Sequence, residues 1–124
     1  MLLSEILRIK GNTLYTTTPE GSALDAVRVM TDNDIGSLVV MDHGRLAGML
    51  TFREVLAAIA SHGGALGAMQ VSEIYERDPL TAAPGLDVME LRGRMLERHA
   101  RYVPVLDGAT LLGVVSFHDV AKAV

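Results

Sequence analysis

The sequence contains no cysteine and no tryptophan. The lack of cysteine excludes disulfide bonds, thiolate catalysis and zinc sites built on cysteine, and it is compatible with the cytoplasm. Aromatic residues make up only 4% of the 124 residues, so a core has to be built from Val, Leu, Ile, Met and Ala. A chain of this length fits one domain of ordinary size, which has roughly 100–150 residues, and leaves no room for two.

Basic residues and long apolar runs are also scarce. The 11 Lys and Arg are outnumbered by 15 Asp and Glu, which gives a net charge of −4. Sequence-independent binding of nucleic acid depends on a basic surface, so we do not expect it here. No apolar run approaches the roughly 18 residues of a membrane span, and the N-terminal segment MLLSEILRIK does not resemble a signal peptide. We therefore expect a soluble, cytoplasmic protein with no membrane partner.

An internal repeat organises the chain. A shift of 65 residues places residues 16–56 over residues 81–121 without a gap, and nine of these 41 positions are identical. Chance gives about two or three identities at ordinary residue frequencies. A second match, Ser4-Glu5-Ile6 with Ser72-Glu73-Ile74, lies upstream at a shift of 68 residues. The identical pairs are Thr16/Thr81, Pro19/Pro84, Met30/Met95, Val40/Val105, Asp42/Asp107, Leu46/Leu111, Gly48/Gly113, Phe52/Phe117 and Val55/Val120.

Each repeat predicts the order strand, helix, strand, strand, helix, and therefore an α/β (α+β) fold. A short β-branched or apolar segment that stops before a proline opens each repeat. Ser22, with Asp25 three residues later, predicts the N-cap of a helix. Asp42-His43-Gly44 and Asp107-Gly108-Ala109 predict hairpin turns between strands apolar enough to be buried on both faces. The expected strands are residues 13–17, 37–41, 45–50, 80–82, 102–106 and 110–115, and the expected closing helices are residues 52–61 and 117–124.

The helical segments carry apolar residues at the spacing of one helix face. These residues are Leu24, Val27 and Met30, then Val55, Leu56 and Ile59 in the first repeat, and Val88, Leu91 and Met95, then Val120 and Val124 in the second.

The repeats define the expected domain organisation. Residues 1–124 form one module, with repeat 1 at residues 1–62, a linker at residues 63–70 and repeat 2 at residues 71–124. The linker contains three glycines and no charge, which predicts flexibility. A half of about 60 residues buries little surface by itself, so we expect the two halves to depend on each other.

The repeat resembles a pair of CBS domains, which are named after cystathionine β-synthase. The family pattern is an apolar hairpin followed by Gly-h-h-[Ser/Thr]-x-x-[Asp/Glu], where h is hydrophobic. Residues 48–54 read Gly-Met-Leu-Thr-Phe-Arg-Glu and residues 113–119 read Gly-Val-Val-Ser-Phe-His-Asp. Residues 102–107, Tyr-Val-Pro-Val-Leu-Asp, also match the family's second strand. The resemblance covers nearly the whole chain, which therefore looks like a stand-alone pair.

The resemblance implies two tandem βαββα repeats packed about a pseudo-twofold axis, with two clefts between them. In the family such clefts bind adenosine-containing ligands such as AMP, ADP, ATP, NAD(H) or S-adenosylmethionine. The implied role is regulatory, with energy sensing as one form of it, and the ligand then acts on an unknown effector protein. Disc-like homodimers are also implied.

The two [Ser/Thr]-x-x-[Asp/Glu] motifs have two interpretations. From the residues alone each is a capping box, which stabilises its helix by about 0.5–2 kcal/mol through the cap residue. The resemblance implies instead that Asp119 accepts hydrogen bonds from both ribose hydroxyls and that Ser116 adds a donor. Thr51 and Glu54 remain open between the two interpretations, because Glu is one methylene longer than the usual Asp. One or two clefts are therefore expected to be occupied.

Further ligand-binding residues follow from the same resemblance. A helix N-terminus attracts phosphate, and Arg53, His118 or Arg101 would meet its charge. Adenine needs an apolar slot and backbone polar groups. The segments that the family pattern indicates for it are Thr16 and Thr17, then Gly36, Ser37 and Leu38, and finally Tyr102, Val103 and Pro104.

The four histidines do not indicate a metal site. No pair has the HxxxH or HExxH spacing of a helix-borne site, so we expect solvated side chains and no metal. A nucleophile with its base is also missing, which excludes an enzyme from the expectation. The alternative to a regulatory sensor is a non-catalytic module for dimerisation or partner docking, with empty or vestigial clefts.

Overall fold

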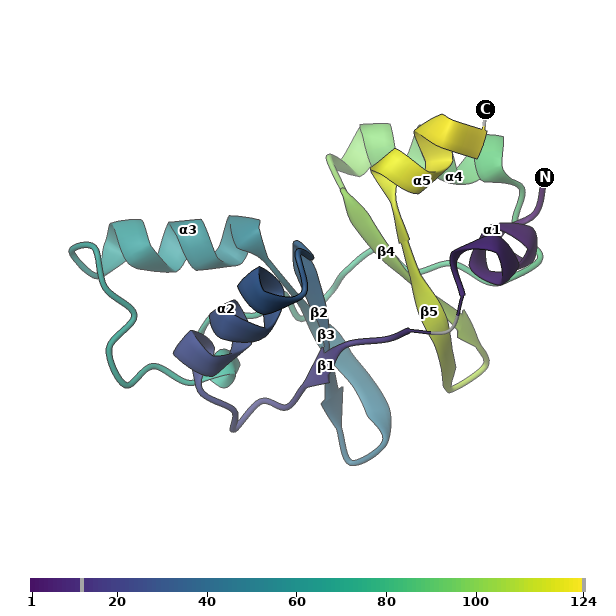
Figure 1. Cartoon of the computed structure of the whole chain (residues 1–124). Coiled ribbons are helices and arrows are strands. Elements are labelled where there is room, and N and C mark those ends of the chain that lie inside the picture. The colour runs from purple at the N-terminus through teal and green to yellow at the C-terminus, as the bar shows by residue number, and fades with distance from the viewer. Residues whose placement is uncertain (12, 124) are drawn as a thin grey trace. The chain divides into compact units, whose positions relative to one another are not determined.

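The structure is a computed structural model that describes residues 1–11 and 13–123 (Figure 1). The chain divides into two compact units. The first-repeat unit consists of Tyr15–Pro79, and the second-repeat unit combines Met1–Leu14 with the chain from Leu80 onward. No helix in the described ranges is long and apolar enough to cross a membrane.

The first-repeat unit contains a three-stranded sheet in the order β1-β2-β3. β1 runs parallel to β2, and β2 is antiparallel to β3, as the sequence predicts for a hairpin that follows a crossover helix. Its elements are β1 (Thr16–Thr17), α2 (Ala23–Asp32), β2 (Ser37–Asp42), β3 (Arg45–Thr51), α3 (Phe52–Ser61) and the short 3₁₀ helix η1 (Val71–Glu73).

The second-repeat unit contains the antiparallel pair β4-β5. Ala82 lies parallel to β4 as an isolated bridge to Val105, so the counterpart of β1 is reduced to one pairing. The fold is therefore the expected α+β repeat, and the chain adds one N-terminal helix that the sequence interpretation did not include. The elements are α1 (Leu3–Lys10), α4 (Val88–Arg98), β4 (Tyr102–Asp107), β5 (Thr110–Ser116) and α5 (Phe117–Ala123); Val124, which was expected to end α5, lies outside the described residues.

The backbone carries the repeat as clearly as the sequence does. The hairpin turns place His43 at φ 51° and Gly108, its equivalent 65 residues later, at φ 60°. Asp34 and His99 are another equivalent pair, with φ of 52° and 54°. Left-handed backbone is uncommon outside glycine, so its recurrence in one register reflects the same turns made twice. Both hairpins also shift register at the equivalent place, Val40/Met41 and Val105/Leu106.

The cores lie on the central strands and on one face of each helix. The middle of β2 is buried at three successive residues, Leu38, Val39 and Val40, which confirms that this strand is covered on both faces. Met30 and Met95 are buried at equivalent positions of α2 and α4. The two interpretations that placed Leu24 and Leu56 on the core face were wrong, because these side chains are 40% and 60% exposed. The small residues Ala23, Ala26 and Ala58 are buried there instead, so the apolar faces are rotated from those expected.

Helix starts follow the expected capping chemistry. The Ser22 hydroxyl accepts the N–H of Asp25 at 3.2 Å and begins α2. At the equivalent position Asp87 begins α4 by accepting the N–H of Met89 at 2.9 Å.

Each lead-in segment packs on the repeat that it does not precede. The helix α1 comes before repeat 1, but Leu3 and Ile6 are buried in the core of the second-repeat unit. The segment after the linker comes before repeat 2, but Val71 of η1 is buried in the core of the first-repeat unit. The matching Ser-Glu-Ile sequences have a shared function, because Glu5 and Glu73 each accept a backbone N–H three residues upstream, at 2.6 and 2.7 Å.

Candidate functional site

The two motifs lie where a strand runs directly into a helix. β5 ends at Ser116 and β3 ends at Thr51, and α5 and α3 begin at the next residue. The N–H of Phe117 donates to the carbonyl of Arg101 at 2.8 Å, and the N–H of Phe52 donates to the carbonyl of Gly36 at 3.1 Å. Each junction is therefore held beside the first residues of the neighbouring strand.

Ser116 and Asp119 form a reciprocal capping box at the second-repeat junction. The N–H of Ser116 donates to Oδ2 of Asp119 at 2.8 Å, and the N–H of Asp119 donates to Oγ of Ser116 at 3.1 Å. The capping interpretation of this motif is confirmed. Two of the backbone donors that the sequence offered to phosphate are bonded within the motif itself.

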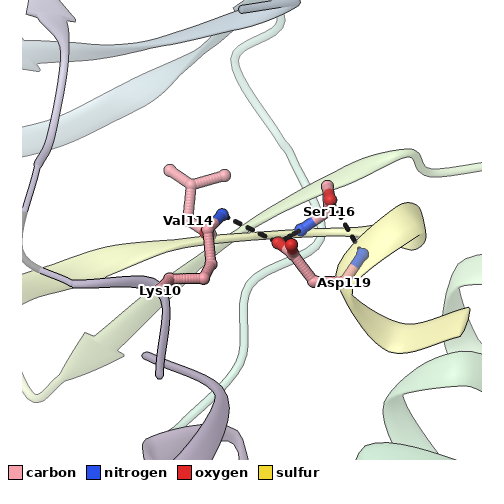
Figure 2. A network of polar contacts seen from close by, with 4 residues as sticks. All are labelled: Lys10, Val114, Ser116 and Asp119. Atoms are coloured by element: carbon pink, nitrogen blue, oxygen red, sulfur yellow. Dashed lines mark hydrogen bonds and ion pairs between the residues drawn. The ribbon is translucent and has the colours of Figure 1, made fainter. Parts of the chain in front are cut away.

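Lys10 from α1 completes this junction (Figure 2). Its ammonium donates to Oδ2 of Asp119 at 2.7 Å and to the carbonyl oxygen of Val114 at 2.7 Å. The side chain of Asp119 is 16% exposed and that of Lys10 is 38% exposed, so the ion pair is partly shielded from water. We refer to Lys10, Ser116 and Asp119 as the lysine-paired junction.

The environment of Asp119 favours its charged form. Burial acts to raise the pKa of this carboxyl, but the hydrogen bond and positive charge of Lys10, together with the N–H of Ser116, outweigh it. The pKa of Asp119 consequently lies below its ordinary value, and the carboxylate is an acceptor at neutral pH.

Thr51 and Glu54 form the corresponding box without a lysine. Oε1 of Glu54 accepts both the N–H and the hydroxyl of Thr51, each at 2.8 Å, and Oγ1 of Thr51 accepts the N–H of Arg53 at 3.2 Å. Both donors to Glu54 are neutral groups. The longer side chain thus folds back onto its own cap, whereas Asp119 is held by a cation.

The structure divides the expected ligand residues between the two units. Leu38, Val103 and Pro104 are buried, so these three residues are placed to offer backbone groups rather than side chains. Arg53 and His118 occupy equivalent exposed positions one turn inside their helices. The first-repeat unit holds Thr16, Thr17, Gly36, Ser37, Leu38, Thr51, Arg53 and Glu54, and the second-repeat unit holds Arg101, Tyr102, Val103, Pro104, Ser116, His118 and Asp119.

Strand pairing explains which of these residues are neighbours. Ser37 lies opposite Thr51, and Tyr102 lies opposite Ser116 in the same register. Thr16 pairs with Val39 at the other edge of β2, so it lies one strand away from the Thr51 junction.

Sequence reasoning missed Lys10. The residue lies outside both repeats as aligned, 109 positions before Asp119. The only available signal was the matching Ser-Glu-Ile lead-in, which marks a recurring structural segment but does not show that the segment crosses to the other repeat.

The histidines are placed away from any ligand cluster. Nδ1 of His43 lies 2.7 Å from Oδ1 of Asp42 on an exposed turn, and Nδ1 of His62 lies 2.8 Å from the carbonyl oxygen of Ala58. In residues 1–11 and 13–123, no group of three or more His, Asp or Glu side chains is arranged to hold a metal ion.

Comparison with known families identifies the fold. A model described as "CBS domain" matches the chain twice, at residues 11–61 and 71–124. The matches cover most of the chain, which therefore belongs to the CBS-domain family and contains a pair of these domains, as the sequence resemblance predicted.

Two relatives illustrate the range of proteins that contain the pair. The mitochondrial CBS domain-containing protein CBSX3 of Arabidopsis thaliana is 31% identical over 98% of this chain, which spans 64% of CBSX3. Arabinose 5-phosphate isomerase KdsD of Yersinia pestis is 28% identical over 98% of this chain, which spans only 37% of that enzyme. The chain is thus similar to a limited part of the enzyme.

Solved structures share the fold over the full chain. A protein with CBS domains from Burkholderia ambifaria is 30% identical, with a TM-score of 0.92, over 99% of this chain and 93% of its own. The CBS pair of protein MJ0100, solved in complex with 5′-methylthioadenosine and S-adenosyl-L-methionine, has a TM-score of 0.87 at 24% identity, over 99% of this chain and 94% of its own.

Proposed function

We propose that the chain is a non-catalytic regulatory module that binds an adenosine-containing ligand at its strand-to-helix junctions. Membership of the CBS-domain family supports the regulatory role. The adenosine ligands of the structurally similar MJ0100 pair support the ligand class. The observation that carries the proposal is the lysine-paired junction, where a charged acceptor is held at a fixed place beside the start of β4.

The chemistry of Asp119 suits a ribose. A carboxylate accepts on both oxygens, and neighbouring ribose hydroxyls are paired donors. In the described part of the chain, Oδ2 of Asp119 takes the N–H of Ser116 and the ammonium of Lys10, while Oδ1 accepts no hydrogen bond. One oxygen is therefore oriented by the protein and the other is available to a ligand. AMP, ADP, ATP, NAD(H) and S-adenosylmethionine all carry this ribose.

We rank the lysine-paired junction above the Thr51–Glu54 junction. Oε1 of Glu54 already accepts two hydrogen bonds from its own cap residue. The longer side chain also alters the geometry of a ribose clamp, and Val39 stands where the second repeat has Pro104. The first-repeat junction is therefore the weaker candidate for ligand binding.

Thermal unfolding with a ligand panel tests the proposal. Each of the five compounds is added in turn at millimolar concentration, with guanosine 5′-monophosphate as the matched control for the base. A ligand that binds only the native state adds RT ln(1 + [L]/Kd), about 2.7 kcal/mol at one hundred times Kd. We expect at least one adenosine compound to raise the unfolding temperature more than the guanosine control. If none does so, the ligand-binding role is wrong.

A role in assembly is the second candidate. Two large side chains on α3, Phe52 and Leu56, are 37% and 60% exposed within one turn of each other. Exposed apolar side chains that cluster are typical of interaction surfaces. We propose a homodimer, and light scattering at micromolar protein measures its mass; a monomer mass would contradict this proposal while leaving ligand binding to the thermal assay.

We also propose a cytoplasmic location. The lack of cysteine is compatible with a reducing compartment. The name of the relative CBSX3 places that protein in mitochondria, so fractionation of cells that express the tagged chain is the direct measurement.

A further inference from the structure

The most unusual polar contact of the molecule joins the N-terminal helix to the second motif. Lys10 is the last residue of α1, and its ammonium reaches Asp119 on α5 (Figure 2). The same ammonium takes the carbonyl of Val114 on β5, at the equivalent place to Met49 of β3. In the first-repeat unit the Met49 carbonyl accepts the backbone N–H of Glu76 instead. A lysine side chain thus replaces a backbone pairing at one of two equivalent strand edges.

We propose that Lys10 is a specificity-determining residue of the lysine-paired junction, which makes this junction selective for adenosine ligands that carry a phosphate. The inference rests on the proposed function, because it concerns the same site. It adds a residue from outside the second CBS repeat, and it separates phosphorylated from unphosphorylated adenosine compounds.

The charges on the two sides of the contact support this role. A carboxylate that binds a ribose lies close to the 5′ oxygen of the same ring, and therefore close to any phosphate attached there. An uncompensated carboxylate would repel that phosphate, whereas the ammonium of Lys10 offsets the negative charge of Asp119 at 2.7 Å. Lysine is also a common phosphate partner, as a compact point charge.

The ammonium retains capacity for a ligand. It has three N–H groups, and the contacts to Val114 and Asp119 use two of them. The Lys10 side chain is 38% exposed, so it is accessible to a phosphate from solvent. Because both bonds to Asp119 fall on Oδ2, a ribose on Oδ1 does not need to displace the lysine.

The first repeat provides an internal contrast. A methyl group on Gly113 would meet Leu7, and one on Gly48 would meet Tyr75, so Leu7 and Tyr75 are equivalent in the two lead-ins. Three residues further, the first lead-in has Lys10 and the second has Asp78. The lead-in that crosses to repeat 2 therefore delivers a base to its junction, and the lead-in that crosses to repeat 1 carries an acid at the same position.

Calorimetric titration with AMP and with adenosine tests the inference, because these two compounds differ only in the phosphate. The ratio of the two dissociation constants is measured within each protein, so a general loss of stability cancels. The proteins are the wild type, Lys10→Gln, Lys10→Arg and Arg8→Gln. The last variant removes an equal charge from the same helix at an exposed residue, and is the matched control.

We expect the wild type to prefer AMP, and Lys10→Gln to reduce that preference about fivefold or more, while Lys10→Arg and Arg8→Gln stay within about twofold of the wild type. Equal weakening of both compounds would make Lys10 a structural residue only. Tighter binding of both would make it a competitor of the ligand. Either result, or an unchanged ratio, overturns the inference.

The failure of the proposed function has a different signature. A wild type that binds no adenosine compound contradicts both proposals together. A wild type that binds S-adenosylmethionine but not AMP keeps the proposed function and overturns the phosphate selectivity.

Discussion

A methyl group built on Gly113 of β5 would lie 2.8 Å from Cδ2 of Leu7 on α1. The N-terminal helix therefore rests directly on the second hairpin, and glycine is needed because the helix approaches so closely. The equivalent Gly48 is even more crowded, since a methyl group there would lie 1.9 Å from the carbonyl oxygen of Glu76 and 2.8 Å from Tyr75. Backbone cannot move aside as the end of a leucine side chain can.

Alanine substitutions at these glycines should therefore differ in cost. We expect Gly48→Ala to reduce the free energy of unfolding by more than about 3 kcal/mol, and Gly113→Ala by about 1–2 kcal/mol. Gly93 lies inside α4 with nothing within 4 Å of an added methyl group, so Gly93→Ala should stabilise by about 0.5–1 kcal/mol. Urea unfolding followed by circular dichroism measures all three. Equal costs for Gly48→Ala and Gly113→Ala would argue against these contacts.

The exchange of lead-in segments predicts where a core mutation is felt. Leu3 is fully buried in the second-repeat unit, and Leu3→Ala should cost about 2–5 kcal/mol. Hydrogen exchange should then accelerate in residues 80–123 before it does so in residues 15–79. Val71→Ala is the matched variant, since Val71 is equally buried in the first-repeat unit, and it should give the opposite order. Loss of protection next to the mutation in sequence alone would contradict the exchange.

Much of the fold was predictable from local signals. Asp107-Gly108 marks a hairpin turn, and the structure places Gly108 at the positive φ that such a turn requires. Ser22 was recognised as an N-cap because its hydroxyl can replace a missing backbone partner. The helix faces were harder to predict, because alanine is small enough to lie on either side. The expected faces centred on Leu24 and Leu56, whereas the structure buries Ala26 and Ala58.

The site was predictable only within each motif. Ser116 and Asp119 are three residues apart, so their capping contacts follow from helix geometry. The contact of Lys10 with Asp119 depends on α1 crossing to the other repeat, and no periodicity within α1 carries that information. Long-range pairing of this kind is set by the whole packing rather than by local sequence.

The ranking of the two junctions leads to a binding prediction. Asp119→Ala should weaken the ligand identified in the thermal panel about tenfold or more, because it removes a hydrogen-bonded charge. Glu54→Ala should weaken it about twofold or less, since Glu54 bonds to its own cap. Asp107→Ala, at an exposed turn, controls for the loss of one negative charge. Calorimetric titration measures the three variants, and a larger loss for Glu54→Ala would reverse the ranking.

The charge of Asp119 also predicts how stability depends on pH. Its pKa is lower in the folded chain than in the unfolded chain, mainly through Lys10 and Ser116 acting against burial. The ionised carboxylate therefore stabilises the fold above the unfolded pKa of about 3.9, and this contribution is lost as the pH falls through the folded pKa. The stability difference between wild type and Asp119→Asn should accordingly be full at neutral pH and shrink in acid.

The measurement is urea unfolding of both proteins at neutral pH and at about pH 3, which lies below the unfolded pKa of an aspartate. Lys10→Gln is the second variant, because it removes the main favourable partner but keeps the carboxyl group. Its Asp119 should titrate at a higher pH than in the wild type when followed by carboxyl ¹³C resonances. An unchanged titration in Lys10→Gln would show that the ion pair does not hold the carboxylate in its charged form, and a stability difference that is constant with pH would show the same for the whole junction.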